Sequence, residues 1–266
     1  NATHLDTRIS VSGTQKELRE LAQAINAMLD RINEAYRSQM RFVSDASHEL
    51  KTPLTSISGY AEIIREGMVK SEDVGRFAGK IYEEAQRLIT LVEDILNLSH
   101  LDEGAPGQER RQGIDLYALC ERAVASLAEA ARQRGIAISL TGSRQRVDGA
   151  EKLLAEIIFN LCDNAIKYNQ ENGHVAVSVT REGDRVVLTV QDTGIGIPPG
   201  ETDRVFERFY RVDKSHSKEI GGTGLGLSIV KHAAAYHDAK IQLDSQLGRG
   251  TRVRVLFPLS QKEAQP

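Results

Sequence analysis

The sequence predicts two kinds of domain. The first is a dimeric four-helix bundle with a coiled-coil lead-in, and the second is an α+β domain built as an α/β sandwich. Apolar residues follow a heptad pattern from Leu18 to Ala46, and a second helical pattern runs over about 72–101. After a stretch rich in Gly, Pro and charge at 103–113, helical and alternating patterns mix. A length of 266 residues suits two or three domains rather than one.

The first helical pattern is a seam of apolar residues spaced alternately three and four apart. Its members are Leu18, Leu21, Ile25, Met28, Ile32, Ala35, Phe42 and Ala46, with Gln39 as the polar exception. A single helix of this kind needs a partner to bury its stripe, so we expect a homodimer. The short break near 67–71 makes the two helices an antiparallel hairpin, and two hairpins form a four-helix bundle.

The α+β part should place its helices on one face of a mixed sheet. The patterns predict helices over about 116–132, 150–168 and 225–236, and strands over 136–140, 175–179, 185–190, 240–245 and 251–257.

Composition excludes several classes of protein. The net charge of −3 and the absence of Trp argue against a nucleic-acid binder, because neither a basic surplus nor an aromatic stacking surface is available. Cys120 and Cys162 lack metal-ligand spacing and indicate a reducing compartment. No run of 18 apolar residues occurs. Since the chain begins at Asn1, we expect an excised fragment whose only link to a membrane would be through missing upstream segments.

The stretch FVSDASHELKTPL at 42–54 places a cluster of polar side chains on the first predicted helix. Thr52 lies four residues after His48 and shares its helical face, and Glu49 follows the histidine directly. A neutral imidazole nitrogen is a competent nucleophile toward phosphorus, and a nearby carboxylate can take its proton. The plainer interpretation is a surface histidine on a polar helix face.

A second polar cluster lies in NLCDNAIKYN at 160–169. Asn160, Asn164, Lys167 and Tyr168 fall on one face of the predicted helix. Amide oxygens and an ammonium group suit phosphate oxygens and a hydrated Mg²⁺ ion. A solvated polar face is the alternative.

Two glycine-rich stretches follow. In QDTGIGIPP, Asp192 ends a strand and can accept a hydrogen bond from an exocyclic amine, while Gly194 and Gly196 permit a sharp turn. In GGTGLGLSIV, Gly222, Gly224 and Gly226 lead into a helix, where exposed N–H groups make an anion site. The latter is neither a Walker A loop nor a dinucleotide fingerprint.

Between the two glycine-rich stretches, Arg208 and Arg211 could reach a terminal phosphate, and the polar run 213–220 resembles a lid over a nucleotide. A loop without a role is the alternative for this run.

Together these motifs resemble the H, N, G1, F and G2 boxes of two-component sensor histidine kinases, in family order. The resemblance covers about residues 16–260 and implies the Bergerat ATP-binding fold of gyrase, MutL and heat-shock chaperones. It implies a partial HAMP and signalling helix at 1–36, a dimerisation and phosphotransfer hairpin at 37–102, a linker at 103–113, a catalytic ATP-binding domain at 114–260 and a tail at 261–266. One departure is His237-Asp238-Ala239 in place of the usual His-Gly-Gly, where we expect Asp238 to adopt a left-handed turn.

The resemblance also implies roles for single residues. His48 would be the phosphoacceptor, Glu49 its base, and Thr52 the residue that orients a water for dephosphorylating the partner. For the nucleotide, the resemblance implies that Asn160 and Asn164 bind Mg²⁺ and phosphates, and that Lys167 binds a phosphate. Tyr168 would contact the base or ribose, Asp192 would bind the adenine amine, and Gly194 and Gly196 would form the turn beside it. Arg208 and Arg211 would bind the γ-phosphate, and the phosphates would be surrounded by Gly222, Thr223, Gly224, Leu225 and Gly226.

The expected function is ATP-dependent phosphorylation of His48 and transfer to an aspartate of a response regulator receiver domain, with phosphatase activity toward that partner. The full-length protein is expected in the bacterial inner membrane, with this fragment on its cytoplasmic side. A non-catalytic scaffold that only binds ATP is one rival. An ATPase of the gyrase or chaperone type is another, disfavoured because Asn160 replaces the glutamate that activates water there.

Overall fold

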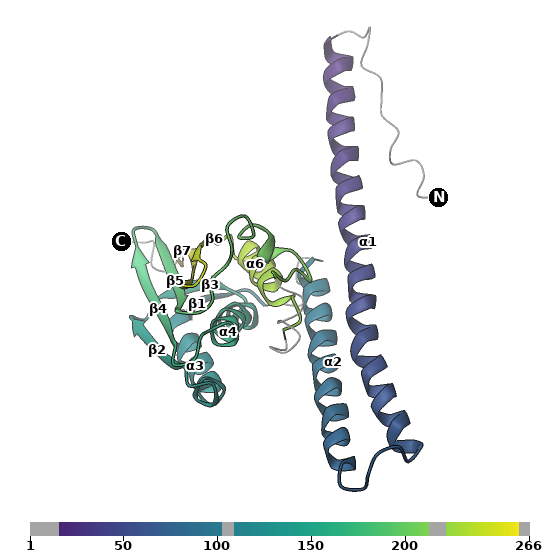
Figure 1. The fold of residues 1–266 in the computed structure, drawn as a ribbon. Coiled ribbons are helices and arrows are strands. Elements are labelled where there is room, and N and C mark those ends of the chain that lie inside the picture. Colours follow the sequence, from purple (N-terminus) through teal and green to yellow (C-terminus); the bar gives the residue numbers. More distant parts are fainter. Residues whose placement is uncertain (1–15, 103–108, 213–221, 261–266) are drawn as a thin grey trace. The chain divides into compact units, whose positions relative to one another are not determined.

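The computed structural model describes residues 16–102, 109–212 and 222–260, which form two compact units, residues 1–85 and residues 86–266 (Figure 1). Four predicted features fall wholly or partly outside the described residues: the first 15 residues of the HAMP-like part, most of the linker, the lid at 213–220 and the tail at 261–266. None of the described helices is both long and apolar enough to cross a bilayer.

The first unit is helical. Helix α1 (Lys16–Arg65) runs without interruption through Pro53, and helix α2 (Val74–Asp102) starts in this unit. The ring of Tyr60 on α1 meets Phe77 on α2 edge-on, with ring centroids 5.7 Å apart. The chain therefore turns back after Arg65 as a helical hairpin, as the break near 67–71 predicted.

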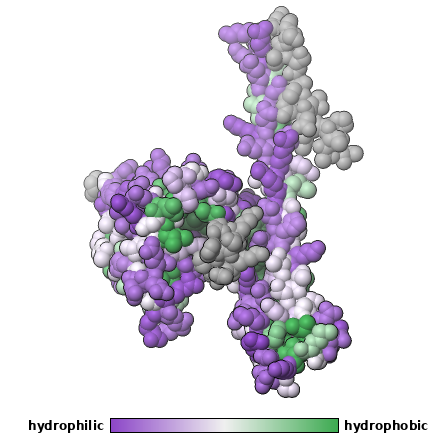
Figure 2. All heavy atoms as spheres, viewed as in Figure 1, coloured by the Kyte–Doolittle hydropathy of each residue, from purple (hydrophilic) through white to green (hydrophobic). Residues whose placement is uncertain are grey.

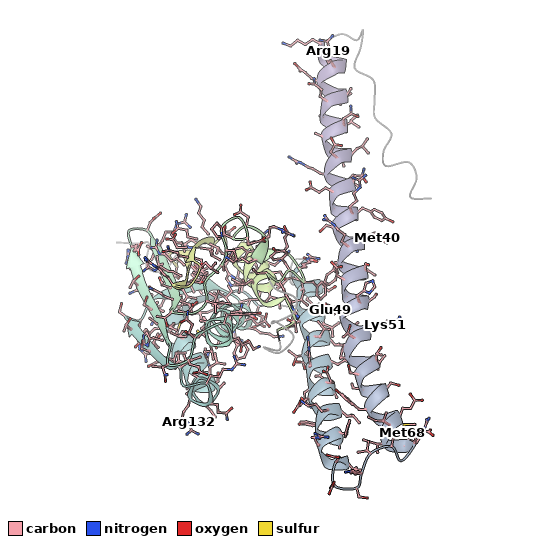
Figure 3. The ribbon with its side chains drawn as sticks, viewed as in Figure 1. Arg19, Met40, Glu49, Lys51, Met68 and Arg132 are labelled. Atoms are coloured by element: carbon pink, nitrogen blue, oxygen red, sulfur yellow. The ribbon has the colours of Figure 1, made fainter. Side chains whose placement is uncertain are left out.

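The seam of α1 is largely uncovered within one chain. Leu21, Met28 and Ile32 are 57, 63 and 41% exposed, and Met68 at the hairpin turn is 76% exposed. Figure 2 shows hydrophobic residues on the surface beside that turn, and Figure 3 shows Met40 and Met68 projecting from the helix and the turn. A row of exposed apolar side chains on a helix this long needs a partner surface to remain soluble.

The second unit is an α+β sandwich, and the predicted fold class is confirmed. Besides the end of α2, its helices are α3 (Leu116–Gln133), α4 (Glu151–Lys167), the 3₁₀ turn η2 (Arg204–Phe206) and α6 (Gly226–Tyr236). Its main sheet contains β2 (Ala137–Gly142), β4 (His174–Glu182), β5 (Arg185–Asp192), β6 (Lys240–Gln246) and β7 (Gly250–Pro258), in the order β2-β4-β5-β7-β6.

The sheet is mixed because β2 pairs with β4 in parallel, whereas the other neighbours are antiparallel. Side chains alternate along β4, where Val175, Val177 and Val179 are completely buried. The face of α4 opposite them contributes Ile157 and Ile158, which are also inaccessible. The apolar side chains of the sheet therefore pack against the apolar face of α4, which buries one face of the sheet under the helices. The polar face of α4 is left available to contact a ligand.

The sequence patterns did not predict two of the strands. β1 (Arg111–Asp115) and β3 (Arg146–Gly149) form a small antiparallel sheet of their own. Residues 111–113, predicted as the end of the linker, therefore belong to a strand. The reason is visible in the contacts, since the N–H of Gly113 donates to Asp148 Oδ1 at 2.8 Å and the Ser260 hydroxyl donates to the same oxygen at 2.5 Å. Partners so distant in sequence leave no local signal.

The turn after α6 confirms the expectation for Asp238, which has a φ of +53°. His237 before it is 1% exposed. Its Nε2 accepts the N–H of Ala150 at 3.0 Å, and its Nδ1 lies 2.6 Å from the carbonyl oxygen of Ala233. The neutral ring with its proton on Nδ1 satisfies both bonds and joins the start of α4 to the end of α6.

A fall in pH should weaken this contact between the start of α4 and the end of α6. Burial lowers the pKa of the His237 imidazole below its usual value, and the nearby charge of Arg110 acts in the same direction. The unfolded chain therefore takes up the proton first as pH falls, so the free energy of unfolding should decrease below about pH 6.5, by up to about 1.4 kcal/mol per pH unit. Urea unfolding of wild type and His237→Gln between pH 8 and 5.5 measures this, and equal slopes would contradict it. Gln retains an amide oxygen for Ala150.

Candidate nucleotide-binding site

A cavity of about 550 Å³ opens beside the polar face of α4. Most residues predicted for the nucleotide line it: Asn160, Asn164, Lys167, Tyr168, Asp192, Gly196, Arg211, Gly222, Thr223, Gly224 and Gly226. Apolar side chains such as Ile195, Leu243 and Leu247 complete the walls. Segments far apart in sequence therefore form one partly apolar pocket with convergent polar groups, which is the usual form of a small-molecule site.

The amide of Asn160 is oriented by the helix that carries it. Its Nδ2 donates to the carbonyl oxygen of Glu156 at 2.9 Å, which turns Oδ1 away from the helix axis. A Cβ built on Gly226 would lie 2.8 Å from that Oδ1, so the start of α6 passes close to the amide. Further along the helix, Lys167 Nζ pairs with Asp163 Oδ2 at 2.6 Å. The face thus presents an amide oxygen and a partly neutralised ammonium.

Asp192 is held rigidly at the end of β5. Its Oδ1 accepts the N–H groups of Gly194 at 2.8 Å and Thr251 at 3.1 Å. Burial raises the pKa of this carboxyl, and the two N–H donors oppose the shift. Both backbone bonds use the same oxygen, so Oδ2 retains its capacity to accept a hydrogen bond from a ligand in the cavity.

The turn after Asp192 is pinned from both sides. The N–H of Ile195 donates to the carbonyl oxygen of Tyr168 at 3.0 Å, and the N–H of Gly248 donates to the carbonyl oxygen of Ile195 at 2.7 Å. Gly196 has a φ of +67°, and a Cβ there would lie 2.1 Å from the carbonyl oxygen of Gln246. Gly194 does not line the cavity; its Cβ would meet the Tyr168 carbonyl oxygen at 2.2 Å, so it serves the turn.

The second glycine loop also lines the cavity and leads into α6. Gly224 has a φ of +75°, which permits the chain to pass next to Phe209. Leu225 is not at the cavity but is completely buried and anchors the loop to the core. The exposed N–H groups of such a loop at a helix start favour anionic groups.

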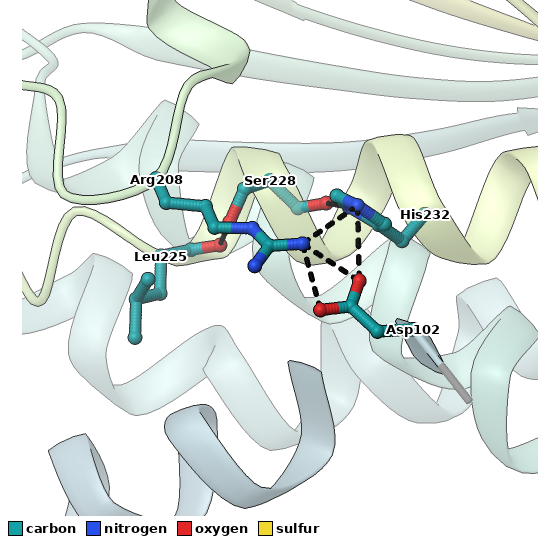
Figure 4. Close-up of polar contacts among 5 residues, drawn as sticks. All are labelled: Asp102, Arg208, Leu225, Ser228 and His232. Atoms are coloured by element: carbon teal, nitrogen blue, oxygen red, sulfur yellow. Dashed lines mark hydrogen bonds and ion pairs between the residues drawn. The ribbon is translucent and has the colours of Figure 1, made fainter. Parts of the chain in front are cut away.

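The two arginines differ in position. Arg211 lines the cavity, whereas Arg208 does not. The Nη2 of Arg208 lies 2.7 and 2.8 Å from the two carboxylate oxygens of Asp102 at the end of α2, and 3.3 Å from His232 Nε2 (Figure 4). Arg208 thus forms an ion pair within the protein, and its contact with a terminal phosphate stays a prediction.

The cavity residues that the sequence patterns missed include Thr90 and Asp94 of α2. The hydroxyl of Thr223 donates to Asp94 Oδ2 at 2.6 Å. A signal for Asp94 was present, because it follows Leu91 by three residues and precedes Leu98 by four, on the buried face of the helix. A carboxylate on such a face indicates a polar partner.

The phosphoacceptor stretch lies in the first unit, on the C-terminal half of α1. His48 and Thr52 are exposed, and Glu49 is half-buried (Figure 3 labels Glu49). The hydroxyl of Thr52 donates to the carbonyl oxygen of His48 at 3.2 Å, which confirms that the two residues share a helical face. An exposed imidazole is accessible to an incoming group.

Three family models match the chain. Residues 149–261 match the histidine kinase-, DNA gyrase B- and HSP90-like ATPase, residues 38–104 the His Kinase A (phospho-acceptor) domain, and residues 2–34 the HAMP domain.

Known relatives match over most of the chain. It is 39% identical over 218 residues to the sensor-like histidine kinase SenX3 of Mycolicibacterium smegmatis, covering 82% of this chain and 56% of SenX3. It is 33% identical over 262 residues to the sensor histidine kinase WalK of Bacillus subtilis, covering 96% and 43% of the two chains. The chain thus spans about half the length of these relatives.

The fold also matches a solved structure. Histidine kinase ThkA, solved in complex with the response regulator protein TrrA, aligns with a TM-score of 0.67 and 20% identity over 88% of this chain and 67% of that chain. Since the ATPase, phosphoacceptor and HAMP models all match, and sensor histidine kinases align over most of its length, the chain belongs to the two-component sensor histidine kinases.

Proposed function

We propose that this protein uses ATP to phosphorylate His48 and passes the phosphoryl group to an aspartate of a response regulator receiver domain. The observation that carries the proposal is the pairing, in one chain, of an exposed imidazole on a phosphoacceptor helix with a cavity whose polar groups suit an adenine nucleotide. Membership of the family makes the regulator the natural acceptor.

The chemistry needs few protein groups. An imidazole nitrogen of His48 attacks the γ-phosphorus, the bond from phosphorus to the β–γ bridging oxygen breaks, and ADP leaves with the electron pair. The proton on the other imidazole nitrogen passes to Glu49 as base. Asp192 Oδ2 accepts from the adenine amine, Tyr168 lies against the base or ribose, and Lys167, Arg211 and the loop from Gly222 to Gly226 hold the phosphates.

The residues present fit Mg²⁺. Bound Mg²⁺ would neutralise charge that develops on the phosphates. The Oδ1 of Asn160 is available because its Nδ2 is engaged by Glu156, and Asn164 lies one turn further along the same cavity wall. Among the described residues no group of three or more His, Cys, Asp or Glu side chains could hold a metal, so phosphate oxygens and waters would complete the coordination.

We further propose that the protein is a homodimer and also dephosphorylates its regulator. The exposed seam on α1 supports the first point, because two such hairpins would bury it in a four-helix bundle. The exposed hydroxyl of Thr52, one turn from His48, supports the second, because it can orient a water for attack on the regulator's phosphoaspartate. The match to the HAMP domain supports a full-length protein held in the bacterial cell membrane, with this part on the cytoplasmic side.

Incubation with γ-labelled ATP and Mg²⁺ tests the proposal. Wild type should acquire an acid-labile, base-stable label, while His48→Gln should lose it and still bind nucleotide, because residue 48 does not line the cavity. Thr52→Ala should keep the label but slow the dephosphorylation of a phosphorylated receiver domain by at least about tenfold. Exposed Thr55, whose hydroxyl likewise bonds the carbonyl four residues back, gives the matched control Thr55→Ala.

Each rival predicts a different result. Free phosphate released without protein label would support an ATPase. Nucleotide binding with neither label nor phosphate release would support a scaffold. Label retained by His48→Gln would place the phosphoacceptor elsewhere.

A further inference from the structure

The end of α2 packs against the nucleotide-binding domain through one face. Leu91, Leu98 and Leu101 are 4, 0 and 9% exposed, and they belong to the same compact unit as the cavity. Asp94 and Asp102 lie on that face as well, four residues before and after Leu98. The contact therefore places Asp94 at the cavity wall and Asp102 beside Arg208, outside that wall.

The first carboxylate engages the glycine loop. Asp94 Oδ2 accepts the hydroxyl of Thr223 at 2.6 Å, and the Thr223 oxygen accepts the N–H of Leu225 at 3.3 Å. Asp94 also lines the cavity itself. Burial raises the pKa of this carboxyl, while the hydrogen bond from Thr223 opposes the shift. The Asp94 carboxyl group thus lies directly at the loop that we propose holds the phosphates.

The second carboxylate engages the arginine. Asp102 holds Arg208 at 2.7 and 2.8 Å, and the side chains of Arg208 and Asp102 are 21 and 35% exposed (Figure 4). His232 supports the pair, because its Nδ1 lies 2.7 Å from the Ser228 carbonyl oxygen. Its Nε2 lies 3.3 Å from both Arg208 Nη2 and Asp102 Oδ1, so the ring contacts both members of the pair. The guanidinium therefore faces α2.

We propose that Asp94 and Asp102 are positioning residues that hold Thr223 and Arg208 against α2, so that docking of α2 and binding of ATP oppose each other. The inference rests on the proposed function, since it concerns the same nucleotide site. Each carboxylate occupies a group that suits a phosphate oxygen, and two anions cannot share that partner without repulsion. ATP binding then releases the end of α2, and release of α2 favours ATP.

The size of the effect follows from mass action. If only a fraction of molecules has α2 released, the apparent dissociation constant for ATP is raised by the inverse of that fraction. A partly exposed ion pair and a single hydrogen bond are both weak, so removing either carboxylate should tighten ATP binding by about threefold, and removing both by about tenfold. A variant that merely lost a structural contact would bind ATP more weakly, so tighter binding distinguishes the proposed competition from structural damage.

Calorimetric titration of the 266-residue chain with Mg²⁺–ATP tests this. The variants are Asp94→Ala, Asp102→Ala and the double variant, and Ala keeps the helix favourable. Exposed Glu93, adjacent to Asp94 on α2, provides the matched control Glu93→Ala. Thermal unfolding of each variant confirms that it is folded, and a second titration with ADP asks whether the γ-phosphate contributes to the competition.

The outcomes separate the two proposals. Tighter binding in both single variants but not in Glu93→Ala supports the inference. Unchanged or weaker binding in folded variants overturns it, because the carboxylates would then not compete with phosphate. Failure of the wild type to bind ATP would overturn the proposed function instead.

Discussion

Replacing Asp192 with asparagine is expected to weaken ATP binding by about 100-fold, because a site built to hydrogen-bond one group rejects the wrong partner strongly. The amide oxygen of the introduced side chain can keep both backbone bonds, from Gly194 and Thr251, since these share a single carboxylate oxygen in the wild type. The amide nitrogen would then face the adenine amine, and two donors cannot bond. Titration of wild type and Asp192→Asn with ATP measures the loss.

Two controls isolate the ligand contact. Thermal unfolding should change little, because the variant keeps its backbone bonds and removes a buried charge whose pKa is raised by that burial. Titration with GTP should show a smaller loss than with ATP, because guanine presents an oxygen that accepts the new N–H. Equal losses for both nucleotides, or retained ATP affinity, would remove Asp192 from base recognition.

Gly196→Ala is expected to destabilise the nucleotide-binding domain by about 3 kcal/mol. The new methyl group would need to lie 2.1 Å from the carbonyl oxygen of Gln246 and 3.0 Å from Leu247 Cα, both backbone atoms, at a φ of +67°. Neither neighbour can rotate away, because the hydrogen bond from Gly248 to Ile195 ties the turn to the same segment. Urea unfolding at constant pH measures the difference.

Gly183 offers a matched control for the backbone conformation. It has a φ of +59°, but a Cβ there would meet no atom within 4 Å. Gly183→Ala should therefore cost only the left-handed conformation, about 1 kcal/mol. Equal destabilisation by the two variants would show that the turn relaxes and that the close approach at Gly196 is without consequence.

The sequence determined most elements by local periodicity. The apolar stripe of α4 predicted a helix over 150–168, and the helix runs over 151–167 with its polar face at the cavity. Glycines predicted the turn after β5 and the loop before α6, because a positive φ or a close approach restricts the residue type. Motifs of this kind lie within a single short segment, so they can be recognised from the sequence without knowledge of the fold.

Tertiary structure decided what depends on partners distant along the chain. The pairing of Arg208 with Asp102, which is 106 residues away in sequence, follows from how the end of α2 packs on the domain. The small sheet of β1 and β3 and the place of Asp94 beside Thr223 have the same origin. A side chain's charge and spacing are local properties, but the group that it pairs with is chosen by packing, and packing is a property of the whole fold.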